Sequence, residues 1–233
     1  MKLYLKNHAE RYPVEQLQLQ LFAQEPSEFC AEPFTGDGTV SSLSRGKRYL
    51  TATAKVTYQG KTGFASNRVL LEKADVRATR RILQRSYYLA ALQVLPAAPP
   101  WGALSGVRPT KLSTKCLMAG GSERVAERLL RQTYFVSPER ARLCVDASRH
   151  TVEAAKKLDA DDLSVYIGIP FCPTRCAYCS FVSQSIERFG EFLPAYLDAL
   201  LREIAHTGAL LKDSGFHIRT LYMGGGTPTT LSS

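Results

Sequence analysis

The chain has 233 residues, and 30 lysines and arginines against 21 aspartates and glutamates give it a formal net charge of +9. Hydrophobic residues make up 45% and charged residues 22%, which excludes a disordered or collagen-like chain and allows a buried core. No apolar run reaches the roughly 18 residues of a membrane-spanning helix, and lysines interrupt the first residues before a signal-peptide core could form. These patterns predict a cytoplasmic protein of one large or two small domains.

The charge is distributed unevenly along the chain. Residues 1–160 carry a formal charge of +11, whereas residues 161–233 carry −2. The acidic stretch at 159–162 stands where the charge changes. We therefore predict a basic amino-terminal domain over residues 1–160 and a second domain over residues 161–233.

The first half of the chain begins with strand patterns. They cover residues 2–5, 48–58 and 61–66, and Gln59-Gly60 predicts a hairpin turn between the last two. Residues 73–95 have a helical pattern instead, with an apolar face formed by Val76, Leu83, Tyr87, Ala90 and Ala91. A second face carries Lys73, Arg77, Arg81 and Arg85 at steps of four. The combination predicts a small α+β domain.

The basic helical face has two interpretations. It is either a solvated surface or a place where phosphates or carboxylates dock, because clustered cations attract anions. No aromatic residues alternate with the basic ones in the way that base stacking requires, so nucleic acid is the weaker ligand hypothesis.

Three shorter helices are expected after a proline-rich break at residues 95–100. The loop 101–111, Trp-Gly-Ala-Leu-Ser-Gly-Val-Arg-Pro-Thr-Lys, leads into the first helix, which should stop at Gly120-Gly121. Ser122 is the predicted N-cap of the second, and Ser137-Pro138 begin the third. Arg108 and Lys111 either begin a helix only or form an anion site with its N-terminus, and the sequence leaves both readings open.

Three of the six cysteines, Cys172, Cys176 and Cys179, lie within eight residues of one another. They follow a strand pattern in which Val165, Ile167 and Ile169 share a face, and α/β folds keep their chemistry at the carboxyl ends of strands. Three thiolates can hold three irons of a [4Fe–4S] cluster and leave the fourth open, whereas a closed zinc site lacks a fourth ligand at the usual spacing. The remaining cysteines, Cys30, Cys116 and Cys144, are interpreted as core residues.

A second strand pattern at residues 219–223 runs into Gly224, Gly225 and Gly226. Residues without a Cβ atom let the backbone approach a ligand and donate its N–H groups. Between the two strands a helix is predicted from the apolar stripe of Leu193, Tyr196, Leu197, Leu200, Leu201 and Ile204. Strand, helix and strand form a right-handed parallel unit, the expected start of a (β/α) barrel.

The motif Cys-x-x-x-Cys-x-aromatic-Cys at Cys172, Cys176, Tyr178 and Cys179 resembles the signature of the radical S-adenosylmethionine (SAM) superfamily. The flanking Tyr166-Ile-Gly-Ile-Pro-Phe and the Gly-Gly-Gly-Thr-Pro-Thr segment from Gly224 are similar to the oxygen-independent coproporphyrinogen III oxidase group. The basic first half and its 101–111 loop further resemble the HemZ-type branch. The fold class that the resemblance implies is α/β: a small α+β domain followed by the start of a partial (β/α) barrel.

The resemblance also implies roles for individual residues. The three cysteines would ligate a [4Fe–4S] cluster, and the open iron would chelate S-adenosyl-L-methionine. Tyr166, Tyr178, Gly224, Gly225, Gly226 and Thr227 would contact the cofactor, with Tyr166 also counted as catalytic. The implied partners are a tetrapyrrole substrate and an electron donor for the cluster.

The implied activity is oxidative decarboxylation of coproporphyrinogen III to protoporphyrinogen IX in heme biosynthesis. Two departures bear on it, because family members often carry a histidine at Gly168 and a further cysteine at Phe181. The alternatives are a heme-binding, chaperone-like relative without decarboxylase activity and a radical SAM enzyme that acts on RNA.

The length of the second half sets a further expectation. A six-unit partial barrel needs roughly 190 residues, whereas residues 163–233 hold two strand patterns and one helix. We therefore expect the chain to be an amino-terminal fragment that cannot enclose the cofactor or turn over by itself.

Overall fold

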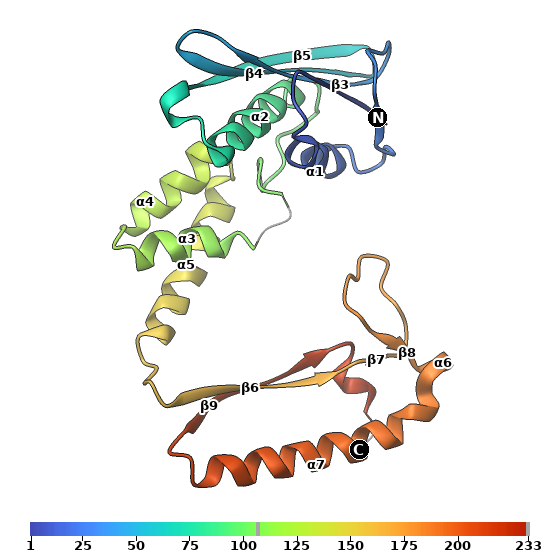
Figure 1. Cartoon of the computed structure of the whole chain (residues 1–233), viewed down its shortest axis with the longest axis vertical. Helices are drawn as coiled ribbons and strands as arrows, with labels where there is room; N and C mark the ends of the chain where they lie inside the picture. Colours follow the sequence, from blue (N-terminus) through green and yellow to red (C-terminus); the bar gives the residue numbers. More distant parts are fainter. Residues whose placement is uncertain (106–107, 232–233) are drawn as a thin grey trace. The chain divides into compact units, whose positions relative to one another are not determined.

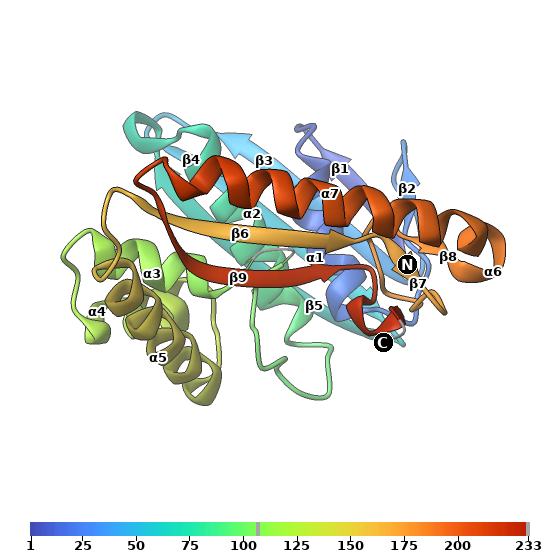
Figure 2. The same ribbon diagram turned by 90° about the horizontal axis from the view of Figure 1, so that it is seen from below.

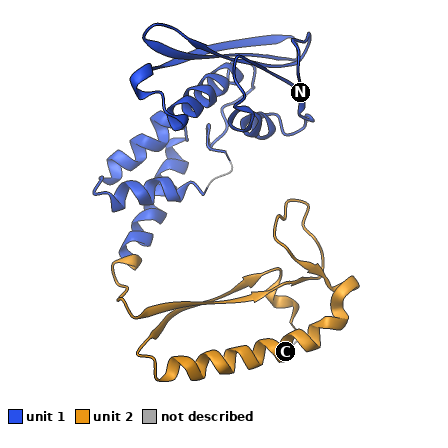
Figure 3. Cartoon of the chain, viewed as in Figure 1, with its two compact units in different colours: residues 1–153 blue, residues 154–233 orange. Residues whose placement is uncertain are grey.

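The computed structural model describes residues 1–105 and 108–231. It divides into two compact units, residues 1–153 and residues 154–233 (Figure 3). Gly106 and Val107 of the predicted 101–111 loop lie outside the described residues. None of the described helices is both long and apolar enough to cross a membrane.

A five-stranded sheet forms one layer of the first unit (Figure 1). Its strands are β1 (Lys2–Lys6), β2 (Glu28–Cys30), β3 (Gly38–Arg45), β4 (Tyr49–Tyr58) and β5 (Lys61–Leu70). Their spatial order is β2-β1-β3-β4-β5. Both neighbours of β1 run parallel to it, while β3, β4 and β5 form an antiparallel meander.

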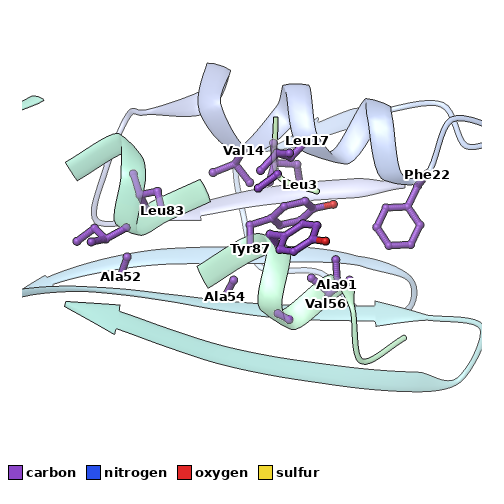
Figure 4. Packing of buried hydrophobic residues seen from close by; sticks show 14 of the residues in the cluster. Leu3, Val14, Leu17, Phe22, Ala52, Ala54, Val56, Leu83, Tyr87 and Ala91 are labelled. Atoms are coloured by element: carbon purple, nitrogen blue, oxygen red, sulfur yellow. The ribbon is translucent and has the colours of Figure 1, made fainter. Parts of the chain in front are cut away.

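Two helices, α1 (Arg11–Leu21) and α2 (Val76–Ala91), lie on one face of this sheet and enclose the main core (Figure 4). Its fully buried side chains come from both layers and include Leu3, Val14, Leu17, Ala52, Val56, Leu83 and Tyr87. Asp75 caps α2 by accepting a hydrogen bond of 2.6 Å from the backbone N–H of Ala78. The core thus depends on short alanines in the sheet that admit the Tyr87 ring.

The sequence predicted part of this unit correctly. The hairpin is confirmed, since Gln59 and Gly60 both have positive φ, 48° and 75°. The helix predicted over 73–95 is shorter, and Val76 is exposed rather than part of the buried face. Helix α1 and strand β3 were not predicted.

Four helical segments complete the first unit: α3 (Thr110–Met118), α4 (Glu123–Arg128), the π-helix η2 (Leu129–Thr133) and α5 (Pro138–Ala155). The predicted N-caps are confirmed, because Ser122 accepts from Val125 at 3.4 Å and Ser137 accepts from Arg140 at 3.3 Å. A second small core, with Ala126, Leu130 and Cys144 at its centre, holds these segments together.

The second unit is built on a parallel pair of strands, β6 (Asp162–Ile169) and β9 (His217–Gly225). A short parallel pair, β7 (Phe171–Cys172) and β8 (Gln184–Ser185), follows β6. The connection to β9 consists of α6 (Ile186–Phe189), the turn η3 (Gly190–Phe192) and the long helix α7 (Leu193–Lys212), and η4 (Pro228–Thr230) follows β9. One strand, helix, strand unit of this kind agrees with the α/β class and leaves the barrel a prediction.

Helix α7 runs alongside β6 and β9 (Figures 1 and 2). Tyr196 attaches it to β6, because its hydroxyl donates to the carbonyl oxygen of Gly168 and its ring meets Phe171 edge-on at 5.4 Å. The predicted apolar stripe is only partly correct, since Leu201 is 63% exposed and Ile204 is also exposed. In α7, which is described over its whole length, no residue is fully buried, and its half-buried side chains are Leu193, Tyr196, Leu197, Leu200, Thr207 and Leu211.

The contact between β5 and α2 generates a stability prediction. A Cβ atom at Gly63 would overlap the carbonyl oxygen of Ala90 and lie 2.9 Å from the Cβ atom of Gln93. We expect Gly63→Ala to lower the free energy of unfolding by about 1–3 kcal/mol, because a packed backbone must move. Urea unfolding followed by circular dichroism measures this. Gly46→Ala is the matched control, since its nearest contact would be an ordinary 3.6 Å; equal losses in both variants would contradict the packing argument.

Candidate functional site

The cysteine segment is a loop whose two ends are held together. Strands β7 and β8 pair at its base, and the backbone N–H of Gln184 donates to the carbonyl oxygen of Pro170 at 2.7 Å. Residues 173–183 leave and return at this point, the carboxyl end of β6. Cys172 is anchored there and only 8% exposed.

The other two cysteines stand further out on the loop. A turn joins them, because the backbone N–H of Cys179 donates to the carbonyl oxygen of Cys176 at 3.0 Å. Tyr178 between them is 90% exposed. Its pKa is raised by a hydrogen bond with the Cys176 side chain and by the negative charge of that thiolate. The Tyr178 side chain therefore lies beside the cysteines, and its contact with a cofactor stays a prediction.

The chemistry of this donor set fits an iron–sulfur cluster. All six cysteines are free, and the three in the loop offer thiolates, the ligands that iron–sulfur clusters use. Across residues 1–105 and 108–231, however, no three His, Cys, Asp or Glu side chains are close enough together to hold a metal ion. The three thiolates of the loop are therefore not gathered at one point in this structure.

The glycine segment lies against the cysteine strand. In the β6–β9 register Gly168 is opposite Gly224, and Ile169 is opposite Gly225. Gly225 has a φ of 105°, and a Cβ atom on it would lie 2.8 Å from the carbonyl oxygen of Ile169. A Cβ atom on Gly226 would lie 2.6 Å from the carbonyl oxygen of Phe171 and 2.8 Å from the Cys172 sulfur. Only residues without a side chain permit this approach.

Two backbone donors of this segment are used within the protein. The N–H of Gly226 donates to the carbonyl oxygen of Ile169 at 2.6 Å, and the N–H of Thr227 donates to that of Phe171 at 2.8 Å. The contact of the segment with a cofactor stays a prediction. The Thr227 hydroxyl in turn donates to the Cys172 sulfur at 3.4 Å.

Tyr166 lies on the open face of the strand pair. Its ring stacks on that of Tyr222 with centroids 5.7 Å apart, and the two rings are 60% and 66% exposed. The space above Gly224 accommodates them, since a Cβ atom there would lie 3.1 Å from the Tyr166 hydroxyl. Tyr222 was not counted as a site residue from the sequence. The parallel register, which sets Tyr166 opposite Tyr222, is the signal that identifies it.

The structure therefore brings Cys172, Gly226 and Thr227 together. Tyr166 lies beside Gly224, which belongs to the same glycine segment. Cys176, Tyr178 and Cys179 share the loop but lie on its exposed part. Of the open alternatives in the first unit, the Arg108–Lys111 segment forms a helical turn, with the Lys111 N–H donating to the Arg108 carbonyl at 3.0 Å. That hydrogen bond agrees with helix initiation, and the anion site remains a hypothesis.

Comparison with known proteins extends over nearly the whole chain. The oxygen-independent coproporphyrinogen-III oxidase-like protein HemZ of Bacillus subtilis is 32% identical over 227 residues, which cover 94% of this chain and 43% of the relative. The anaerobilin synthase of Escherichia coli O157:H7 is 33% identical over 135 residues, 58% of this chain and 26% of that protein. The chain thus spans less than half the length of these relatives.

Two further relatives match shorter parts of the chain. The oxygen-independent coproporphyrinogen III oxidase of Salmonella typhimurium is 37% identical over 81 residues, 35% of this chain and 17% of the relative. The heme chaperone HemW of Bacillus subtilis is 41% identical over 69 residues, 30% of this chain and 17% of the relative. No family model and no solved structure matches the chain.

The contact between Gly226 and Cys172 yields a second prediction. We expect Gly226→Ala to push the glycine segment away from the Cys172 sulfur and to reduce the iron bound per chain after anaerobic reconstitution to less than roughly half, because overpacking at this contact displaces backbone. Iron and sulfide analysis measures the effect. Gly208→Ala on α7 is the control, since nothing lies within 4 Å of its new Cβ atom. Full iron content in Gly226→Ala would refute the importance of the close approach.

Proposed function

Because the chain belongs to the oxygen-independent coproporphyrinogen III oxidase group of the radical SAM superfamily, we propose that its full-length protein converts coproporphyrinogen III to protoporphyrinogen IX. In this reaction each of two propionate groups loses a hydrogen atom and CO₂ and passes one electron to an acceptor, leaving a vinyl group. The observation that carries the proposal is the meeting of Cys172, Gly226 and Thr227 at the carboxyl end of β6.

Three residues would hold the cofactor cluster: Cys172, Cys176 and Cys179. A [4Fe–4S] cluster with S-adenosyl-L-methionine supplies one-electron cleavage and a radical that abstracts hydrogen. The anchored position of Cys172 fixes one corner of the site, while the turn between Cys176 and Cys179 lets the other two thiolates move together.

The chain's own residues would position the strand end at Cys172 and shield the reacting carbon from water. The glycine segment and Thr227 hold the strand end against Cys172, and the Thr227 hydroxyl supports its sulfur. Tyr166 and Tyr222 provide an aromatic surface on the open face, where a ligand can contact both rings. Contact there would exclude water from the reacting carbon. The proposed partners are the tetrapyrrole and an electron donor for the cluster.

A second candidate function is a heme-carrying, chaperone-like role without decarboxylation. The similarity of 30% of the chain to the heme chaperone HemW favours it. Gly168 stands where many family members have histidine, and a Cβ atom there would lie 3.2 Å from the Tyr166 ring. The open face near Tyr166 is therefore arranged differently from one that carries the histidine.

The deciding experiment uses the full-length protein, reconstituted under anaerobic conditions and given SAM, a reductant and coproporphyrinogen III. We expect 5′-deoxyadenosine together with a product carrying two vinyl groups, detected by chromatography after oxidation to the porphyrin. SAM cleavage without vinyl product would overturn the decarboxylase proposal. Stoichiometric heme uptake without turnover would establish the second candidate.

The cysteine assignment has its own test. Single changes of Cys172, Cys176 and Cys179 to alanine should each abolish SAM cleavage and remove most of the visible cluster absorbance, because a cluster iron loses its thiolate. Cys30→Ala is the control, since Cys30 lies on β2 of the first unit. Unchanged SAM cleavage in any of the three variants would exclude that residue as a ligand.

A further inference from the structure

A cavity of about 730 Å³ lies within the first unit, in the part that the sequence analysis left without a function. Its walls come from the end of α2, the loop around Ala98-Pro99, helix α4, the π-helix η2 and the turn at Ser137-Pro138. All of its lining residues belong to residues 1–153, so the cavity is complete within one unit. A space of this size holds a small organic molecule.

One wall of the cavity is strongly basic. Arg124, Arg128 and Arg131 line it, at a spacing of four and three residues along α4 and η2. Arg131 pairs with Glu127 at 3.2 Å. In the described part of the chain, Arg124 and Arg128 have no carboxylate within 4.0 Å, so two guanidinium groups are available to an anion. Arginine binds carboxylates through paired hydrogen bonds.

A second wall is aromatic. The rings of Tyr88 and Phe135 stack with centroids 5.0 Å apart, and both residues line the cavity. The Arg85 guanidinium lies 4.7 Å from the centroid of the Phe135 ring, and it donates a hydrogen bond of 3.0 Å to the carbonyl oxygen of Gln132. Tyr88 is only 1% exposed and Arg85 lies over Phe135, so a flat apolar ring would contact the edge of Phe135 together with Leu92 and Pro99, which also line the cavity. The cavity therefore offers cations and an aromatic wall to the same ligand.

The backbone around the aromatic wall is held in rare conformations. Phe135 has a φ of 59°, in the left-handed region that non-glycine residues seldom adopt, and η2 is a five-residue π-helix. Two bonds fix this corner, from the Ala103 N–H to Tyr134 at 2.7 Å and from the Ser137 N–H to Pro100 at 2.9 Å. A strained backbone of this kind persists only where the surrounding structure holds it in place, and such strain is concentrated at binding sites.

We propose that this cavity is a binding site for a carboxylated, unsaturated ring compound, with the ring against Leu92, Pro99 and the edge of Phe135 and the carboxylates on Arg124 and Arg128. Among such compounds we choose a propionate-bearing tetrapyrrole as the ligand, and this choice rests on the proposed function. The site lies on a different unit from the cysteine loop. It gives the basic amino-terminal unit the task of recognising the ligand's carboxylates.

The test is a titration of the 233-residue chain with coproporphyrin III, followed by porphyrin fluorescence anisotropy. All proteins carry Cys172→Ala, Cys176→Ala and Cys179→Ala, so that neither cluster nor loop thiolate contributes. We expect saturable binding that weakens roughly tenfold or more in Arg124→Glu/Arg128→Glu, because the carboxylates meet repulsion instead of paired bonds.

The control variant is Arg77→Glu/Arg81→Glu. It makes the same change in charge on α2, at exposed positions that do not line the cavity. We expect its affinity to stay within about twofold, since exposed charges act weakly at a distance. Arg124→Gln/Arg128→Gln should weaken binding to an intermediate degree, and circular dichroism confirms that each variant is folded.

Three outcomes would overturn the proposal: equal weakening by both glutamate pairs, equal binding of the coproporphyrin tetramethyl ester, or displacement of the porphyrin by single-stranded RNA at lower concentration than by free carboxylates. The result is independent of the proposed reaction. Specific porphyrin binding together with absence of vinyl product would contradict the decarboxylase proposal and leave the cavity proposal standing. Formation of the vinyl product together with any of these three outcomes would contradict the cavity proposal and leave the proposed reaction standing.

Discussion

The parallel pairing of β6 with β9 is the interaction on which the candidate site depends. It joins residues more than fifty positions apart and sets Gly168 opposite Gly224. Beyond the last paired residues the same hydrogen-bond ladder continues into Gly226 and Thr227, which donate to Ile169 and Phe171. The glycines are therefore required first by the protein's own backbone, because a side chain at either Gly225 or Gly226 would collide with the facing strand. Their value for ligand binding follows from that closeness.

Helix α7 is attached to the strand pair at β6. Tyr196 ties the helix to this strand, in which Val165 is partly buried. Leu221, the residue of β9 paired with Val165, is 63% exposed, and Tyr166 and Tyr222 on the other face are exposed as well. The anchored strand end therefore carries accessible side chains on both faces, and a ligand site needs this combination of rigid backbone and accessible side chains.

Sequence reasoning succeeded where the signal is local. The hairpin at Gln59-Gly60 and the caps Ser122 and Ser137 are determined by a few adjacent residues. It failed for α1, where leucine and glutamine alternate and no side chain caps the start, so the helical period is weak. It also failed for β3, a serine-rich strand whose Thr39 and Ser41 are buried on the face of the sheet, where Tyr87 of α2 meets Thr39. Burial of such polar residues comes from tertiary packing, which no short window contains.

The same distinction explains what could be foreseen of the functional residues. The three cysteines of the loop are proposed as cluster ligands from their spacing alone, and that assignment stays a prediction. The role of Tyr222 depends on strand register, and the fact that Gly226 and Thr227 already use their N–H groups depends on the path of the chain past β6. The basic cavity is harder still to predict from the sequence, because Tyr88 and Arg131 come to line the same cavity only when the helices have folded. Arg85 shows the consequence most directly: it belongs to the basic stripe in sequence, yet its guanidinium lies over Phe135 and supports an aromatic wall. A charge counted from sequence becomes a binding determinant only when its surroundings leave it available, as they do for Arg124 and Arg128.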